Sequence, residues 1–338
     1  MTGAGSKTDA AVVLGPGQPA AVRKNARRSA PTTDRSPRSP YTVVIVSFAH
    51  DQPFLDLQAR SLRLYLGDEP QFIKKIIIVD NFDVTRLNRS SISAHLGPLS
   101  SRTAFLSLED FPVLPPSAGW MRQQALKLLV ARKVDTPRYI LLDAKNHLVR
   151  PLTRDFVETP DGTLMRSRPV GYRNLSLCQF VVNAIDYFGL DPGMVDSFMA
   201  STTPFSMSTS FTQSLLAYVE DREQRDFGWW FCERPRAARV SEFAMYAAFL
   251  AFVRGGLSNL YHLTNPAPAT VWKASVAQFD KTLMEACKQA FFGVHRGAFG
   301  MLDARQRRDL ARLWTQRGLF DSAKRALIFI DECAEYYT

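Results

Sequence analysis

The chain has 338 residues, 46% of them hydrophobic, so it is long enough to bury a sizeable core as one large domain or two small ones. Its net charge of +10 is divided between residues 1–40, with seven Lys and Arg against two Asp, and the rest of the chain, with 35 basic against 30 acidic residues. The excess beyond residue 40 fits a site for phosphate-bearing ligands at least as well as a groove for nucleic acid, and no apolar run reaches the roughly 18–20 residues of a membrane-spanning helix.

Residues 1–40 are rich in Ala, Pro, Gly, Ser, Thr and Arg and almost lack large apolar side chains. Such a segment cannot bury enough surface to offset the entropy lost on ordering, so we expect a disordered basic tail. We favour a solvated extension over a segment that binds lipid or nucleic acid. The start of the chain has no apolar signal-peptide core, and the four cysteines lack metal-binding or redox spacing, so we expect a cytoplasmic protein.

From Tyr41 onward the first half of the chain alternates apolar runs with amphipathic segments. The predicted elements are a strand at 42–48, a helix at 51–66, strands at 74–79 and 104–108, a helix at 120–132 and a strand at 139–142. Asp51 is a plausible cap for the first helix. A strand, a helix and a second strand in this order begin a right-handed parallel crossover, which predicts an α/β fold with a mainly parallel sheet.

The second half is less regular. Its predicted elements are a hairpin over 162–170, helices at 177–188, 213–222 and 241–250, a Ser/Thr-rich loop at 201–212, and short strands at 259–263 and 271–272. Two basic helices at 303–317 and 322–335 should pack against the sheet domain. We therefore expect a tail (1–40), one domain (41–300) and C-terminal helices (301–338).

Polar residues follow the apolar strands at the points where they end. The strand 139–142 stops at Asp143, and residues 144–147 follow where the chain must leave the sheet. Open α/β sheets bind their ligands at this carboxyl edge. The candidate ligand-binding residues there are Ser47, Phe48, His50, Asp80, Asn81, Asp143 and Lys145. Asp143 is alternatively a cap for the turn that follows it, and Asp80 and Asn81 are alternatively Asx-turn residues.

Several of these stretches resemble a known family. Two βα units, the segment Gly119-Trp-Met-Arg-Gln-Gln-Ala-Leu-Lys-Leu128 and the segment Tyr139-Ile-Leu-Leu-Asp143-Ala-Lys145 are similar to the nucleotide-sugar-binding half of GT-A-fold glycosyltransferases. The sequence of these segments is similar to that of a bacterial branch known as a domain of unknown function with glycosyltransferase-like character. The resemblance covers roughly residues 41–300. It implies a GT-A-like sheet with an acceptor-side subregion, and a nucleotide base near the end of the first strand.

The chain departs from the family at the Asp-x-Asp motif, whose two acids bind manganese or magnesium in the resembled proteins. Asp143 stands at the first position, but Lys145 replaces the second acid. Hard cations need oxygen ligands, which a protonated amine cannot provide. A Mn²⁺ or Mg²⁺ site would need Asp143 with Asn146, His147 or His295. We favour the other reading, in which Lys145 meets the diphosphate and supplies the charge that a metal would bring.

Other candidates carry two readings each. The resemblance makes Glu242 the acceptor-side acid, and an acid entering an apolar helix suits a general base; its alternative is a pair with Arg239. Arg122, His295 and Arg296 are candidates for the diphosphate or are solvated loop and helix residues. Trp229 and Trp230 form either an acceptor-side sugar platform or part of the core. His147 is more often a packed histidine than a ligand.

The sequence therefore predicts a glycosyltransferase that moves a sugar from a nucleotide-sugar donor to an acceptor hydroxyl, such as that of a glycan, with Asp143 and Glu242 as its catalytic acids. A reaction that retains the anomeric configuration would make the role of Glu242 wrong. The alternative is a module of the same fold that binds a nucleotide sugar or a glycan without turnover, which Lys145 favours. Binding of nucleic acid through the basic tail ranks last.

Overall fold

The fold is a mixed α/β structure built on a mainly parallel sheet, as the sequence predicts. A computed structural model describes residues 39–66, 72–82, 84–116, 119–167, 169–173, 177–191, 197–265 and 268–337. All but the last two residues of the predicted N-terminal tail lie outside these ranges.

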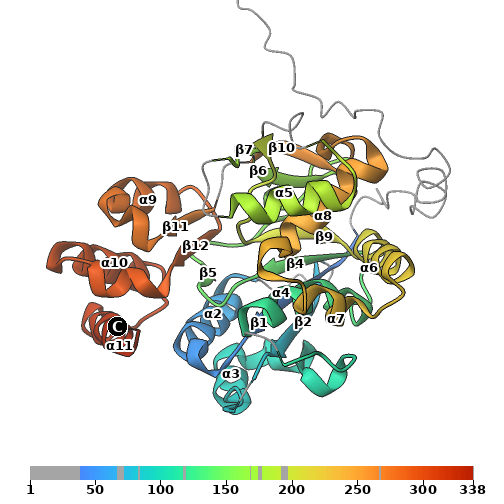
Figure 1. The fold of residues 1–338 in the computed structure, drawn as a ribbon. Coiled ribbons are helices and arrows are strands. Elements are labelled where there is room, and N and C mark those ends of the chain that lie inside the picture. Colours follow the sequence, from blue (N-terminus) through green and yellow to red (C-terminus); the bar gives the residue numbers. More distant parts are fainter. Residues whose placement is uncertain are drawn as a thin grey trace, which may run out of the picture.

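The central sheet has the strand order β3-β2-β1-β4-β9 (Figure 1). Its strands are β1 (Tyr41–Ser47), β2 (Ile73–Asp80), β3 (Thr103–Ser107), β4 (Arg138–Leu142) and β9 (Phe205–Ser208). The first four are parallel, and β9 pairs antiparallel with β4. Every residue of β1 and β4 is buried, which explains why these strands read as continuous apolar runs instead of alternating patterns.

The remaining strands form three small sheets. A three-stranded sheet contains β5 (Asn146–Leu148), β11 (Ala269–Val271) and β12 (Phe291–Val294). Two-stranded pairs join β6 (Leu164–Ser167) to β10 (Tyr261–Asn265), and β7 (Val170–Gly171) to β8 (Ser197–Phe198). The chain therefore passes from β4 through a short turn directly into β5 of a neighbouring sheet.

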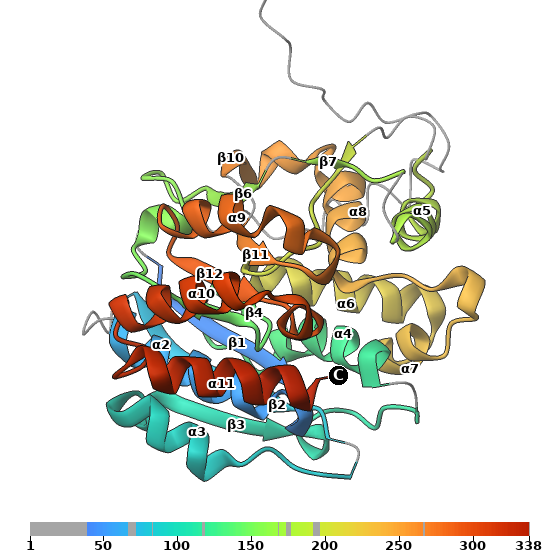
Figure 2. The same ribbon diagram turned by 90° about the vertical axis from the view of Figure 1, so that its left-hand side faces the viewer.

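Helices cover the sheets. In chain order they are α2 (Gln52–Tyr65), α3 (Arg89–Leu96), α4 (Gly119–Leu129), α5 (Cys178–Tyr187), α6 (Thr209–Glu223), α7 (Phe227–Cys232), α8 (Glu242–Arg254), α9 (Phe279–Ala286), α10 (Ala304–Gln316) and α11 (Ala323–Tyr336). Figure 2 shows α10 and α11 crossing in front of the central sheet. No helix in the described ranges is both long and apolar enough to cross a membrane.

Helix α4 crosses the carboxyl edge of the sheet. Near its start, Asn81 after β2 donates its Nδ2 to the carbonyl oxygen of Gly119 at 2.8 Å. One turn later Gln123 donates its Nε2 to the carbonyl oxygen of Val46 in β1 at 2.7 Å. The helix then reaches the end of β4 with Lys127. These contacts fix which α4 side chains face the strand ends.

The C-terminal helices are joined to α2 by hydrogen bonds to the loop between them. Arg60 donates Nη1 to the carbonyl oxygen of Leu319 at 2.7 Å, and Tyr65 donates its hydroxyl to that of Arg317 at 2.6 Å. The end of α11 reaches the carboxyl edge of β1, where the Tyr337 hydroxyl donates to the carbonyl oxygen of His50 at 2.9 Å.

Several local predictions are wrong. Residues 162–170 do not form a hairpin, because β6 pairs with β10 and β7 with β8. Residues 201–212 are not a loop throughout: they contain β9 and the start of α6. The predicted strand at 259–263 is present but begins two residues later, as β10 (Tyr261–Asn265), after a 3-10 helix at Leu257–Asn259. Asp51 stands at the N-cap of α2 but makes no capping hydrogen bond with its side chain.

Candidate functional site at the carboxyl edge of the sheet

Asp143 opens a tight turn between β4 and β5. The Asp143 amide donates to Oδ1 of Asn146 at 2.9 Å, and the Asn146 amide donates to the Asp143 carbonyl oxygen at 2.9 Å. Gln58 of α2 donates its Nε2 to the carbonyl oxygens of Asp143 and Asn146, at 2.9 and 2.6 Å. Asn146 and Gln58 thus stabilise the turn, and the Asp143 carboxylate is not needed as its cap.

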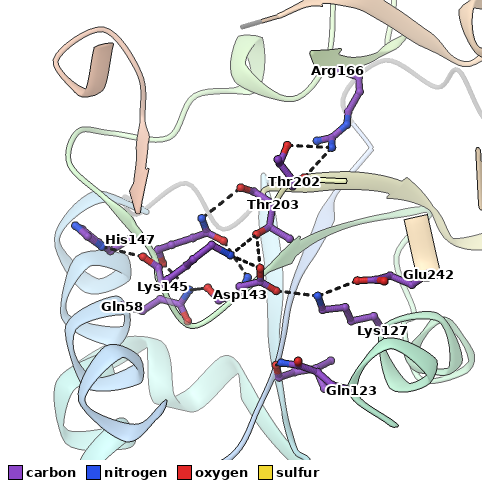
Figure 3. A network of polar contacts seen from close by, with 12 residues as sticks. Gln58, Gln123, Lys127, Asp143, Lys145, His147, Arg166, Thr202, Thr203 and Glu242 are labelled. Atoms are coloured by element: carbon purple, nitrogen blue, oxygen red, sulfur yellow. Dashed lines mark hydrogen bonds and ion pairs between the residues drawn. The ribbon is translucent and has the colours of Figure 1, made fainter. Parts of the chain in front are cut away.

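The Asp143 carboxylate instead contacts two ammonium groups and a hydroxyl (Figure 3). Its Oδ1 lies 2.8 Å from Nζ of Lys127, and its Oδ2 pairs with Lys145 and accepts from Oγ1 of Thr203 at 2.8 Å. Burial alone would raise the pKa of Asp143, but Lys127 and Lys145 outweigh it and hold this pKa well below its usual value. Asp143 is therefore an anion whose charge is already balanced.

Lys127 links Asp143 to Glu242. Its Nζ lies 3.0 Å from Oε1 of Glu242, and both side chains are only 6% exposed. Burial acts to lower the pKa of Lys127, but the Asp143 and Glu242 carboxylates raise it above the usual 10.5. Ser241 caps α8 as the sequence predicts, yet Glu242 pairs with Lys127 instead of Arg239. A buried carboxylate bound to an ammonium group does not fit the predicted role of a base that faces an acceptor.

Besides Asp143, Lys145 contacts an aromatic residue, Trp272, that was not among the predicted site residues. Its Nζ lies 5.1 Å from the ring centroid of Trp272, and the ring of His295 lies 5.5 Å from the same ring. Trp272 is 37% exposed, and the Lys145 side chain is 12% exposed. Lys145, Trp272 and His295 therefore form one partly open cluster beside Asp143.

His295 presents a donor to this cluster. Burial first, and then the positive charges of Lys145 and Arg296, lower the pKa of His295 below 6.5, so the ring is neutral at neutral pH. Its Nδ1 lies 3.2 Å from the amide of Gly297, which can only donate. We therefore assign the ring proton to Nε2, which leaves an N–H group for a ligand.

The end of β1 brings a second acid to the site. Asp51 lies 3.4 Å from Nη1 of Arg296, and the guanidinium of Arg296 lies 5.7 Å from the ring centroid of Phe48. Burial raises the pKa of Asp51 to about 6, opposed by Arg296 and Lys145 and reinforced by the negative charge of Asp143. The structure thus brings together Phe48 and Arg296, two of the residues predicted to bind the donor.

Two further residues of the β1 end are less open. Ser47 is fully buried, and the ring of His50 contacts the rings of Tyr336 and Tyr337 at centroid distances of 4.7 and 5.0 Å. The end of α11 therefore contacts the half-buried ring of His50, a residue predicted to lie beside a nucleotide base.

The predicted contacts at β2 and α4 have other partners. Asp80 accepts from the amide of Leu87 at 3.1 Å and is 1% exposed. Asn81 accepts from Nε of Arg122 at 2.6 Å, and Arg122 also donates Nη2 to the carbonyl oxygen of Phe82 at 3.1 Å. These side chains stabilise the turn after β2 and the first turn of α4, and their assignment to the donor site stays a prediction.

The residues proposed for a metal do not fit one. Trp314 donates its Nε1 to Nε2 of His147 at 2.9 Å, so His147 carries its proton on Nδ1, 3.3 Å from the Lys145 carbonyl oxygen. Burial lowers the pKa of His147 to about 4, and the ring is a neutral link between β5 and α10. Within the described ranges, no three His, Cys, Asp or Glu side chains converge as metal ligands. Both Asp143 oxygens already contact ammonium groups.

The two tryptophans predicted as an acceptor-side platform lie on α7. Trp230 is buried in α7, with its ring 4.9 Å from that of Tyr187 and 5.9 Å from that of Phe227. Trp229 is half-buried, and Arg225 lies 5.4 Å from its ring centroid. Trp230 belongs to the core, and the partly exposed indole beside Asp143 is Trp272.

Replacing Asp51 by Asn tests the raised pKa. The folded chain binds the Asp51 proton more tightly than the unfolded chain, so this group's stabilisation is complete below about pH 4 and is lost as the pH rises through about 6. At pH 7.5 the loss amounts to at most about 3 kcal/mol. We expect Asp51→Asn to be more stable than wild type at pH 7.5 and not at pH 4.5, measured by urea unfolding.

The matched control is Asp321→Asn on an exposed loop, which should change stability little at either pH. Equal destabilisation of Asp51→Asn at both pH values would show that Asp51 acts mainly as the partner of Arg296.

Comparisons with solved structures find distant similarity to several glycosyltransferases. The galactosyltransferase LgtC, bound to donor and acceptor sugar analogues, matches with a TM-score of 0.44 and 11% identity over 86% of this chain and 95% of LgtC. The bifunctional glycosyltransferase WbbM without ligand matches with a TM-score of 0.42 and 9% identity, over 78% of this chain and 46% of WbbM.

The glycosyltransferase GlyE of Streptococcus pneumoniae TIGR4 matches with a TM-score of 0.42 and 9% identity, over 87% of this chain and 63% of GlyE. No curated protein matches the chain in sequence. A family model described as a family of unknown function (DUF6492) matches residues 46–319.

Proposed function

The chain belongs to the family of unknown function DUF6492, and we propose that it is a glycosyltransferase that binds the diphosphate of a nucleotide-sugar donor through Lys145 without a divalent cation. The observation that carries the proposal is the position of Lys145. Lys145 lies in the turn that follows β4, two residues after Asp143, and its ammonium group lies beside the indole of Trp272, which in turn contacts the imidazole of His295. Ligands of open α/β sheets bind at this edge.

The charges of the residues around Asp143 support this role for Lys145. In the interior, Lys127 is shared by the carboxylates of Asp143 and Glu242. Lys145 and Arg296 lie on the outer side of the network, and Nε2–H of His295 adds a neutral donor. Ammonium, guanidinium and imidazole N–H groups are the donors that stabilise the charge on a departing diphosphate. The exposed face of Trp272 offers a surface on which a sugar ring or a base stacks.

A metal is not needed in this arrangement. Lys145 contributes one positive charge close to where the family motif would hold a cation. Thr203 shares Oδ2 of Asp143 with Lys145, and Lys127 contacts Oδ1. Asp143 would then orient Lys145 and would not itself bind a metal.

A binding module without turnover is the second candidate. It is supported by the state of the two predicted catalytic acids, since Asp143 and Glu242 are both ion-paired with Lys127. Of the described acids close to Lys145, Asp51 has the raised pKa that proton transfer near neutral pH requires. Transfer chemistry in this site would therefore use Asp51 as its base, or none of the chain's own carboxylates.

Release of nucleoside diphosphate from a panel of nucleotide sugars, with and without glycan acceptors, separates the two candidates. The enzyme reading predicts release by the purified wild type and loss of release in Asp51→Asn and Lys145→Met. Binding of the same donors by wild type without any release would support the module. If the wild type bound none of these donors, both candidate functions would be excluded.

A further inference from the structure

A buried cation lines a cavity on the far side of the Thr203 loop from Asp143. Arg166 of β6 is 3% exposed and donates Nη1 to the carbonyl oxygen of Pro204 at 2.7 Å, and Nη2 to those of Ala200 and Thr202. Figure 3 shows Thr202 and Thr203 between Arg166 and Asp143. The guanidinium also lies 3.8 Å from the ring centroid of Phe205.

The charge of Arg166 has no carboxylate to balance it. In the described part of the chain no acid forms an ion pair with Arg166, and its buried Nε–H has no acceptor. Burial lowers the pKa of Arg166 to about 10, so it is still a cation at neutral pH. Carbonyl oxygens solvate a guanidinium only in part, and a buried charge without a counterion is costly.

The carboxylate of Glu158, in the same region, is hydrogen-bonded to other side chains. Glu158 accepts from the Tyr41 hydroxyl at 2.8 Å, from Arg154 at 2.9 Å and from Arg138. Two guanidinium groups therefore share this one carboxylate. The next residue back along the chain, Val157, lines the cavity. Among the described residues named here, three guanidinium groups, including Arg166, accompany the one carboxylate of Glu158.

The cavity has a volume of about 240 Å³. Its polar lining includes Arg166, Ser206, Lys288 and Gln289, and its apolar walls include Phe156 and Phe291. The volume lies below the roughly 300–1,000 Å³ of pockets for drug-sized ligands, which limits the occupant to a small molecule. Two cations and a hydroxyl around a small cavity select an anion with oxygen acceptors.

We propose that this cavity binds a small oxyanion, a carboxylate or a phosphate, whose charge balances Arg166. The site is separate from the Lys145 cluster, and the proposal does not rest on the proposed function. Because Arg166 also binds the carbonyl oxygens of the 200–204 loop, an occupant stabilises the segment that presents Thr203 to Asp143.

Calorimetric titration of the Lys145→Met variant with inorganic phosphate and with acetate tests the proposal, since that background removes the lysine to which the proposed function assigns diphosphate binding. At least one anion should bind saturably, whereas chloride at equal ionic strength should not. In the double variant Lys145→Met/Arg166→Gln we expect affinity to fall by about ten-fold or more.

A second variant keeps the test decisive if Arg166→Gln does not fold. Lys288 is exposed at the rim, so Lys145→Met/Lys288→Glu should fold normally and bind several-fold more weakly. The matched control Lys145→Met/Lys324→Glu reverses an exposed lysine away from the cavity and should leave affinity unchanged. The proposal is overturned if neither anion binds saturably, or if Lys288→Glu binds as well as the control.

Discussion

The variant Lys127→Met is expected to lose about 3–5 kcal/mol of the free energy of unfolding, measured by urea titration. The substitution keeps the length of the side chain but removes the ammonium group between Asp143 and Glu242. Asp143 retains Lys145 and Thr203, whereas the carboxylate of Glu242 is left buried without its counterion. An unpaired buried charge is among the most costly defects that a single substitution makes.

The double variant Lys127→Met/Glu242→Gln should recover a large part of the loss, because it removes the unpaired charge together with its partner. Lys133→Met makes the same change at an exposed position close to the end of α4 and should be nearly neutral. If Lys127→Met unfolded at the same urea concentration as this control, the buried Asp143-Lys127-Glu242 chain would not be a stabilising network.

The variant Lys145→Met is expected to weaken the binding of nucleoside diphosphates by about ten- to one-hundred-fold, measured by calorimetry. A charged hydrogen bond from the ammonium to a phosphate oxygen is lost, and nothing else in the cluster replaces it. Lys145→Arg keeps the charge and should retain part of the affinity.

The control for general damage is the circular dichroism spectrum and unfolding midpoint of Lys145→Met. Asp143 still pairs with Lys127 in this variant, so the fold should persist. Wild-type affinity in a folded Lys145→Met protein would place the diphosphate, if it binds at all, away from the Asp143 turn.

Four strands of the central sheet could be predicted from the sequence, most clearly β1 and β4, because every residue of these two strands is buried. Tyr41–Ser47 and Arg138–Leu142 read as largely apolar runs without alternation. The first crossover follows from the order of the strand at 42–48, the helix at 51–66 and the strand at 74–79. The strand β9 was hidden by its composition: only Phe205 and Met207 point to the core, between Ser206 and Ser208, and Pro204 precedes them. Two apolar residues in a Ser/Thr-rich segment are typical of a loop.

The position of the site at the end of β4 could be predicted, but the ion pairs between its side chains could not. Asp143 and Lys145 follow from the place where an apolar strand stops. Lys127 reads as a solvated residue on an amphipathic helix, and its burial arises because α4 crosses the carboxyl edge instead of lying along a face. The spacing of apolar residues along a helix predicts the helix, but it does not predict where the helix packs in the fold.

Asp51 and Trp272 were missed for different reasons. Asp51 precedes a proline at the start of a helix, a pattern that favours a cap, and its contact with Arg296 joins residues 245 positions apart. Trp272 lies in a short apolar stretch that resembles a strand, and it reaches Lys145 only because β11 pairs with β12 in the neighbouring sheet.

The most direct test of the central claim is a calorimetric titration of wild-type protein with a panel of nucleoside diphosphates, once in EDTA and once in manganese chloride. If Lys145 supplies the charge that meets the diphosphate, one of these ligands binds with the same affinity in both buffers. Binding that occurs only with manganese would contradict the account.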